Sequence, residues 1–183
     1  LTSKRGKSEE KANLGNMLDY MIFEALTELD RFSVLAMGRT ETLGCFCPVN
    51  TLLRNAIEAL ADNFDTVLID CEAGLEQINR QVVKELQTLL VISDPSSRGM
   101  ETAAMIRKMI VEDRVIRCDK VRLVFNRVRG NEDYLRESAA TLEIELAGLV
   151  PFDENIAQFD LVGKPITDLP SDSPSLESYR RIV

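Results

Sequence analysis

The sequence contains no histidine among its 183 residues. Catalytic triads that depend on histidine are therefore excluded, and any transition-metal site must use thiolates or carboxylates. No apolar run approaches the roughly 18 residues that would indicate a membrane span. The basic residues near the N-terminus are not followed by the apolar stretch of a signal peptide. We therefore expect a cytoplasmic protein that makes no membrane contact.

Basic residues are also in short supply, with 22 Lys and Arg against 30 Asp and Glu and a net charge of −8. Nucleic-acid surfaces need clustered Lys and Arg to neutralise phosphates, and the only dense cluster is Lys4, Arg5 and Lys7. This composition argues against a nucleic-acid partner. Without an export signal, the four cysteines are expected to be reduced thiols rather than a disulfide framework.

Short apolar runs alternate with amphipathic stretches along most of the chain. Such alternation predicts one domain over 1–183, with a doubly wound, mostly parallel α/β sheet and right-handed crossovers. Residues 1–13 are polar and are expected to be poorly ordered, and the proline-containing segment 165–174 is expected to be a loop before a last short helix. The predicted strands are 32–37, 66–69, 88–92, 121–125 and 146–150, and the predicted helices are 14–29, 49–62, 99–112 and 131–142.

Ligands of such sheets bind beyond the carboxyl ends of the strands, and polar or turn-forming residues follow every predicted strand. The run TVLID at 66–70, followed by CEAG, has the form of a Walker B strand with a switch II glycine. Asp70 would hold a water bound to Mg²⁺, and the backbone of Gly74 would approach a terminal phosphate. A strand that simply ends in Asp and turns at Gly explains the same short pattern.

Cys45 and Cys47 form a C-x-C pair just before the predicted helix 49–62. The positive end of a helix favours thiolates. Two sulfurs cannot complete a thiolate site, but two copies across a dimer axis supply four. Two buried small side chains, or a disulfide, are the alternatives. Cys71 and Cys118 are separate, and are expected to be a packing residue and a loop thiol.

Two further candidates for ligand binding follow the last two predicted strands. Asn126 carries an amide that offers both a donor and an acceptor to an adenine edge, and Pro151 with Phe152 could form an apolar wall for a base. A strand-capping Asn and a buried Phe are equally ordinary explanations. Gly6-Lys7-Ser8 matches the end of a Walker A motif, but no strand precedes it and no apolar helix follows, so we attribute it to chance.

These residues resemble the CooC-type ATPases, the accessory proteins for nickel insertion into carbon monoxide dehydrogenase, within the MinD/ParA group of P-loop ATPases. The C-x-C loop followed by PVN, together with the D-x-E-A-G switch, is much more specific than either pattern alone. The similar stretches are LAMGRTETLGCFCPVN at 35–50, DNFDTVLIDCEAGLE at 62–76, VISDPSSRGMETA at 91–103, VRLVFNRV at 121–128 and VPFDENIAQFDLVGKPI at 150–166.

The resemblance implies an ATPase that dimerises around ATP or ADP with Mg²⁺ and binds Ni²⁺ between its two subunits, with Zn²⁺ as an alternative. Cys45 and Cys47 would be the metal ligands, and carbon monoxide dehydrogenase the client. Asp70 and Gly74 would be switch II residues. Asn126, with Arg127 beside it, would face adenine, while Pro151 and Phe152 would line the base.

The chain departs from this family in showing no K-G-G-x-G-K-[ST] loop. We therefore expect no measurable ATP hydrolysis by this polypeptide alone, and exposed sheet edge and apolar surface. Two other functions stay open, a non-hydrolysing thiolate metallochaperone and a generic MinD/ParA-type ATPase.

Overall fold

The computed structural model describes residues 20–36, 47–71, 83 and 85–182, with residues 47–53 described at the level of the backbone. The chain divides into two compact units, Leu1–Asp70 and Cys71–Val183. Each unit has a hydrophobic core of its own. The single domain expected from the sequence therefore stays a prediction.

The second unit is built on three parallel strands, β3 (Glu85–Ser93), β4 (Arg117–Val128) and β5 (Glu145–Pro151), in the order β3-β4-β5. Helix α4 (Ser97–Arg107), continued by a π-helical turn (Lys108–Glu112), connects β3 to β4, and α5 (Glu132–Thr141) connects β4 to β5. All five of these elements overlap predicted ones. The parallel α/β architecture predicted from the alternating pattern is confirmed here.

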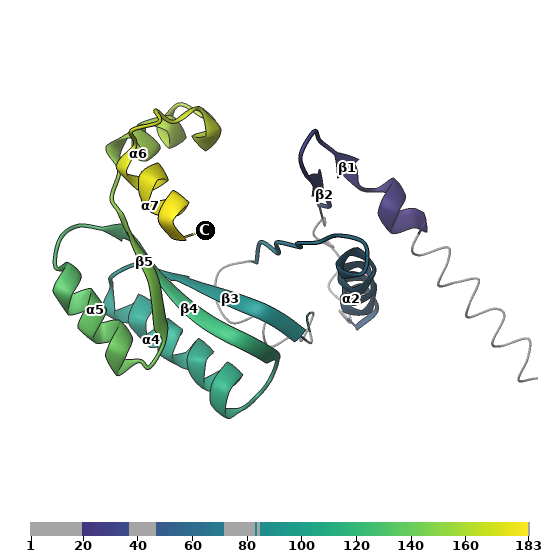
Figure 1. Cartoon of the computed structure of the whole chain (residues 1–183), viewed down its shortest axis with the longest axis horizontal. Helices are drawn as coiled ribbons and strands as arrows, with labels where there is room; N and C mark the ends of the chain where they lie inside the picture. Colours follow the sequence, from purple (N-terminus) through teal and green to yellow (C-terminus); the bar gives the residue numbers. More distant parts are fainter. Residues whose placement is uncertain (1–19, 37–46, 72–82, 84, 183) are drawn as a thin grey trace, which may run out of the picture. The chain divides into compact units, whose positions relative to one another are not determined.

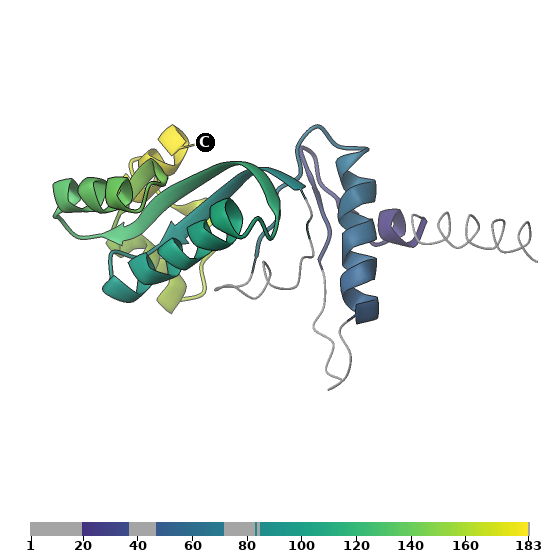
Figure 2. The ribbon, with the colours of Figure 1, turned by 90° about the horizontal axis from the view of Figure 1, so that it is seen from below.

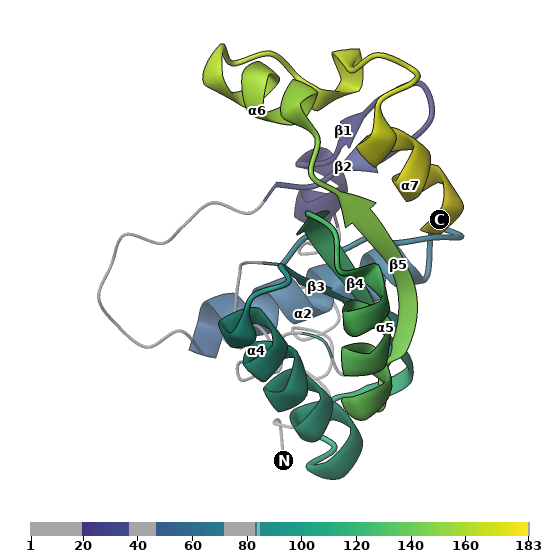
Figure 3. The ribbon, with the colours of Figure 1, turned by 90° about the vertical axis from the view of Figure 1, so that its left-hand side faces the viewer.

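Helices α4 and α5 cover one face of this sheet, and α7 (Pro174–Ile182) packs against β5 from the other face (Figures 1 and 3). The close approach of α7 depends on Gly148, because a Cβ at that position would lie 2.5 Å from Cγ1 of Ile182. Any larger residue there would push α7 away from the strand.

The core of the second unit lies between the sheet and the helices α4 and α5. Leu123 and Phe125 of β4 are completely buried in it. Burial of each such side chain contributes roughly 2–3 kcal/mol, so the central strand is the best-anchored element of the unit. The buried members of this core are Val91, Ala103, Leu123, Phe125, Val128, Leu135, Ala139 and Ile144.

The chain after β5 forms helix α6 (Glu154–Leu161), a short 3-10 turn (Ile166–Asp168) and α7. Helix α7 confirms the short last helix predicted from the sequence. Helix α6 was not predicted, because its polar start was taken for a loop. Asp153 caps α6 by accepting the backbone N–H of Asn155 at 2.9 Å.

The first unit contains helical residues 20–24, a hairpin of β1 (Thr27–Glu28) and β2 (Ser33–Val34), and helix α2 (Cys47–Ala61). Figure 2 shows α2 from the side, along its length. Among the side chains described there, Ile22, Ala56 and Leu60 form a buried cluster, with Leu26 and Leu35 against them. Helix α2 confirms the predicted helix 49–62.

Two predictions for this unit are wrong. The predicted parallel strand 32–37 is only β2, which pairs antiparallel with β1. Residues 66–70 are extended but form no strand, and Leu68 is 89% exposed. Within the described residues of this unit, the β1–β2 hairpin is the only ladder. No helix in the described ranges has the length and apolar character needed to cross a bilayer.

Candidate functional site

The carboxyl ends of β3, β4 and β5 lie at one edge of the parallel sheet, where ligands of such sheets bind (Figure 3). The backbone N–H of Phe152 donates to the carbonyl of Val128 at 2.8 Å and joins the ends of β4 and β5. Four residues predicted as the base site, Asn126, Arg127, Pro151 and Phe152, are therefore carried by two adjacent strand ends.

The loop after β3 is a tight turn closed by Asp94. Its Oδ1 accepts the backbone N–H of Ser96 at 3.0 Å and the Ser96 hydroxyl at 2.5 Å, while the Ser96 hydroxyl accepts the N–H of Gly99 at 3.1 Å and caps α4. The Ser96 side-chain hydrogen bond, the Ser96 backbone hydrogen bond and the nearby charge of Arg127 lower the pKa of Asp94. This loop thus presents a fixed negative charge beside Arg127.

The end of β4 and the loop after it hold unusual backbone conformations. Arg127 has a φ of 60°, followed by Gly130 at 76° and Asn131 at 57°. For a residue with a side chain, this left-handed conformation costs about 1 kcal/mol. The side-chain Oδ1 of Asn126 accepts the backbone N–H of Arg127 at 2.9 Å, which fixes the amide at the strand end. Its two N–H donors then remain for a ligand or for water.

Phe152 after β5 carries a cation on its ring, because the Arg129 guanidinium carbon lies 3.7 Å from the ring centroid. A cation this close to an aromatic face is attracted by the ring electrons. Sequence analysis missed Arg129, because the register that pairs Val128 with Pro151 brings it to Phe152. Nothing in the spacing of the two residues signals the contact.

Asp153 is a second residue that sequence analysis missed. It is 6% exposed, and its Oδ2 accepts the hydroxyls of Ser173 at 2.5 Å and Ser175 at 2.9 Å. Burial raises the pKa of Asp153, but hydrogen bonds from Ser173, Asn155 and Ser175 outweigh it and lower the pKa to about 2. The sequence signal was present, since Ser173 followed by Pro174 is typical of a helix start. This network joins the start of α6 to the start of α7.

The residues predicted to handle phosphate, Mg²⁺ and nickel are not assembled in the described part of the chain. Asp70 is exposed at the end of the first unit, and Gly74 and Cys45 lie outside the described residues. Cys47 is the first residue of α2, known from its backbone. No group of three or more Cys, Asp or Glu residues that could hold a metal occurs among the residues with described positions. These assignments stay predictions.

Cys71 is exposed, and Cys118 is partly buried on β4. The expectation that Cys71 is a packing residue is therefore wrong, because residues 66–70 before it form no buried strand. Cys118 is also not the loop thiol that was expected, because β4 begins at Arg117, four residues earlier than the predicted strand.

Comparison with known proteins gives relatives that bind ATP. No family model matches the chain. It is 37% identical over 169 residues to the uncharacterized ATP-binding protein MJ0685 of Methanocaldococcus jannaschii, covering 90% of this chain and 65% of that protein. It is 30% identical over 129 residues to the carbon monoxide dehydrogenase accessory protein CooC of Rhodospirillum rubrum, covering 69% of this chain and 47% of that protein. It is 29% identical over 137 residues to the septum site-determining protein MinD of Bacillus subtilis, covering 72% and 50%.

Solved structures give the same fold. The MinD cell division protein of Aquifex aeolicus superposes with a TM-score of 0.66 at 17% identity, covering 88% of this chain and 67% of that one. A ParA family ATPase from Chlorobium tepidum gives a TM-score of 0.69 at 16% identity, covering 93% and 72%. The chain spans 65% or less of each of the three sequence relatives above. It has the MinD/ParA fold, and its sequence is similar to an ATP-binding protein and to MinD.

Proposed function

We propose that the second unit supplies the base-recognising side of an ATP site of the MinD/ParA type. The observation that carries this proposal is the hydrogen bond from the N–H of Phe152 to the carbonyl of Val128, at 2.8 Å. It holds Asn126 and Arg127 beside Pro151 and Phe152 at the ligand-binding edge of the sheet. The similarity to ATP-binding proteins supports the choice of ligand.

Asn126 and the Arg129–Phe152 pair have distinct tasks in the proposed site. The N–H donors of Asn126 bond to an acceptor atom of the base, because its oxygen is already engaged by Arg127. The stacked pair of Arg129 and Phe152 offers a flat surface on which a base can lie, with the guanidinium or the ring as its partner. Both contacts suit a purine ring.

The phosphate side of the site is assigned to the sequence around 70–74. Asp70 would orient a water on Mg²⁺, and the Gly74 backbone would meet the terminal phosphate. Mg²⁺, when bound, neutralises charge that develops on the phosphates. ATP hydrolysis is thus an activity of the whole protein in this proposal.

The test is ATP affinity, measured by titration calorimetry on the whole protein that carries this sequence. Asn126→Ala removes the amide donors, and we expect roughly tenfold weaker binding, the loss of one or two hydrogen bonds to a ligand. Asn63→Ala is the matched control, because Asn63 is an exposed amide whose Nδ2 donates to the carbonyl of Ala59 in the first unit. Equal affinities of Asn126→Ala and the unchanged protein would contradict the proposal.

A second function is favoured by the Cys45 and Cys47 pair and by the 30% identity to CooC. In this proposal the protein is a cytoplasmic homodimer that holds Ni²⁺ through four thiolates and delivers it to carbon monoxide dehydrogenase. Helix α2 begins at Cys47, where the positive helix end favours the thiolate form. Zn²⁺ would suit four thiolates equally well.

This second function predicts one metal ion per dimer, lost in the Cys45→Ser, Cys47→Ser double variant. Nickel and zinc content are measured by mass spectrometry after gel filtration, and Cys71→Ser, Cys118→Ser is the matched control pair. Undiminished metal content in the Cys45→Ser, Cys47→Ser variant would contradict this second function.

A further inference from the structure

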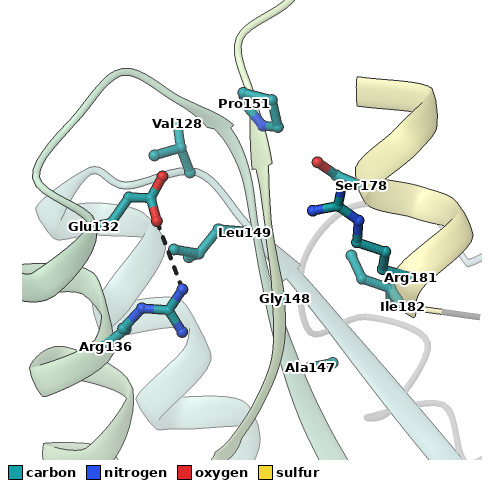
Figure 4. Close-up of a pocket in the computed structure, with 10 residues that line it drawn as sticks. All are labelled: Val128, Glu132, Arg136, Ala147, Gly148, Leu149, Pro151, Ser178, Arg181 and Ile182. Atoms are coloured by element: carbon teal, nitrogen blue, oxygen red, sulfur yellow. Dashed lines mark ion pairs between the residues drawn. The ribbon is translucent and has the colours of Figure 1, made fainter. Parts of the chain in front are cut away.

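An open pocket of about 360 Å³ runs along the outer edge of β5 (Figure 4), and of the residues proposed to bind the base only Pro151 belongs to its lining. Its floor is the strand itself at Ala147, Gly148 and Leu149. One wall is α5, and the other wall is the last turn of α7. The pocket therefore has the shape of a trough with a strand edge at its base.

The edge of β5 is open at this point. It is the last strand of the sheet within the described residues, so no further strand there pairs with its outer main-chain groups. Proteins usually protect such edges with charged residues, proline or bulges. β5 has Glu145 and Pro151 only at its two ends, and its centre carries the small residues Ala147 and Gly148. An extended peptide could pair there at the usual strand spacing of about 4.8 Å.

Each wall of the trough carries one arginine that forms a long, exposed ion pair with a glutamate. Arg136 on α5 is 60% exposed and lies 3.6 Å from Glu132, and Arg181 on α7 is 79% exposed and lies 3.8 Å from Glu177. Exposed pairs at such distances contribute little, so both guanidinium groups are available to a stronger partner. The lining holds two arginines and one glutamate, and each arginine has a glutamate within 4 Å, so an acidic ligand would bind by replacing Glu132 and Glu177 at the two guanidinium groups.

The position of the two arginines predicts a pattern in the ligand. Successive side chains of a strand point to opposite faces of the sheet, and here α5 lies on one face and α7 on the other. A strand added to β5 would send one residue toward Arg136 and the next toward Arg181. We propose that the β5 edge binds an extended segment of a partner protein with two consecutive acidic residues, as an added strand. Main-chain pairing gives affinity, and the two arginines give selectivity.

The probe for this proposal is a fluorescent heptapeptide of alternating threonine and valine around a central Glu–Asp pair. Its binding to the 183-residue chain is followed by fluorescence anisotropy. We expect saturable binding that weakens roughly tenfold when the pair is changed to Gln–Asn, and that is lost when alternate backbone nitrogens are methylated. In the complex, amide exchange should slow at Ala147 to Leu149.

Single variants test whether each wall of the trough contributes to peptide binding. Arg136→Gln and Arg181→Gln are each expected to weaken binding roughly tenfold without unfolding the chain, because both side chains are exposed. Arg117→Gln is the matched control, since Arg117 is an exposed arginine in an ion pair with Glu85 outside the trough. The proposal is overturned by full binding of the methylated peptide, by unchanged binding in both variants, or by no saturable binding up to about 1 mM. It is equally overturned if the chain dimerises through β5 and excludes the peptide.

Discussion

The two units of the molecule differ in how they bury their apolar residues. In the second unit, eight buried side chains form one cluster between a parallel sheet and two helices. Among the side chains of the first unit that the structure describes, the corresponding cluster has three buried members, Ile22, Ala56 and Leu60. Exposed apolar side chains occur in both units, for example Leu68 at 89% in the first and Leu161 at 86% in the second, so the difference lies in the buried clusters. Among the described side chains, the larger cluster thus lies between a sheet and two helices, whereas the smaller one joins α2 to the residues around the hairpin.

This difference predicts that the two units unfold with different stabilities. Phe125 is completely buried, so Phe125→Ala should destabilise the second unit by about 3–5 kcal/mol. Leu60 is 8% exposed, and Leu60→Ala should lower the free energy of unfolding of the first unit by about 2–3 kcal/mol, because it removes a buried side chain that is not completely enclosed. Urea-dependent hydrogen exchange, followed by mass spectrometry, reports on each unit separately.

The control for both variants is Leu161→Ala, at an 86% exposed position where truncation removes no core contact. Each core variant should lower protection mainly in its own unit. If Phe125→Ala lowers protection equally in both, the chain is one cooperative domain, as the sequence predicted, and the comparison fails.

Weakening the hydrogen bonds of Asp153 is expected to give the second-largest loss of stability. Asp153→Asn leaves the hydroxyls of Ser173 and Ser175 facing a weaker, uncharged acceptor, and should cost on the order of 2 kcal/mol by thermal or urea unfolding. Asp172→Asn, next to Ser173 but exposed, is the matched control. A loss no larger than that of the control would show that the charge of Asp153 does not hold α6 and α7 together.

The same hydrogen bonds make the stability of the second unit depend on pH. The folded pKa of Asp153 is about 2, below its ordinary value of 3.8, so the unfolded chain takes up the proton first as the pH falls. Its contribution is complete above about pH 4 and is lost toward pH 2. Asp153→Asn should therefore reduce the acid sensitivity of the second unit in this window. The first unit serves as the internal reference, because Asp153 lies outside it.

The strands that the sequence could predict lie in the second unit, and the strands that it predicted wrongly lie in the first. Strands β3, β4 and β5 were predictable because runs such as VRLVF are apolar enough for burial on both faces and occur between clear helices. Residues 66–69 have the same character, yet they form no strand in the structure, so an apolar run does not by itself place a segment in a sheet. The contacts of Arg129 with Phe152 and of Asp153 with Ser173 were missed for a related reason, because they join residues that only the fold brings together.

Variants of Arg127 test whether the backbone of the second unit is strained at the proposed nucleotide site. Its φ of 60° favours glycine, so Arg127→Gly should be about 1 kcal/mol more stable than Arg127→Ala, which keeps the strain but also lacks the guanidinium. Both variants remove the cation beside Asp94, and both should lose ATP affinity to the same extent. Urea unfolding and ATP titration of the two variants separate the effects. Equal stabilities would mean that the backbone at Arg127 relaxes without cost, whereas a difference in ATP affinity between them would mean that the conformation itself, rather than the charge, prepares the site.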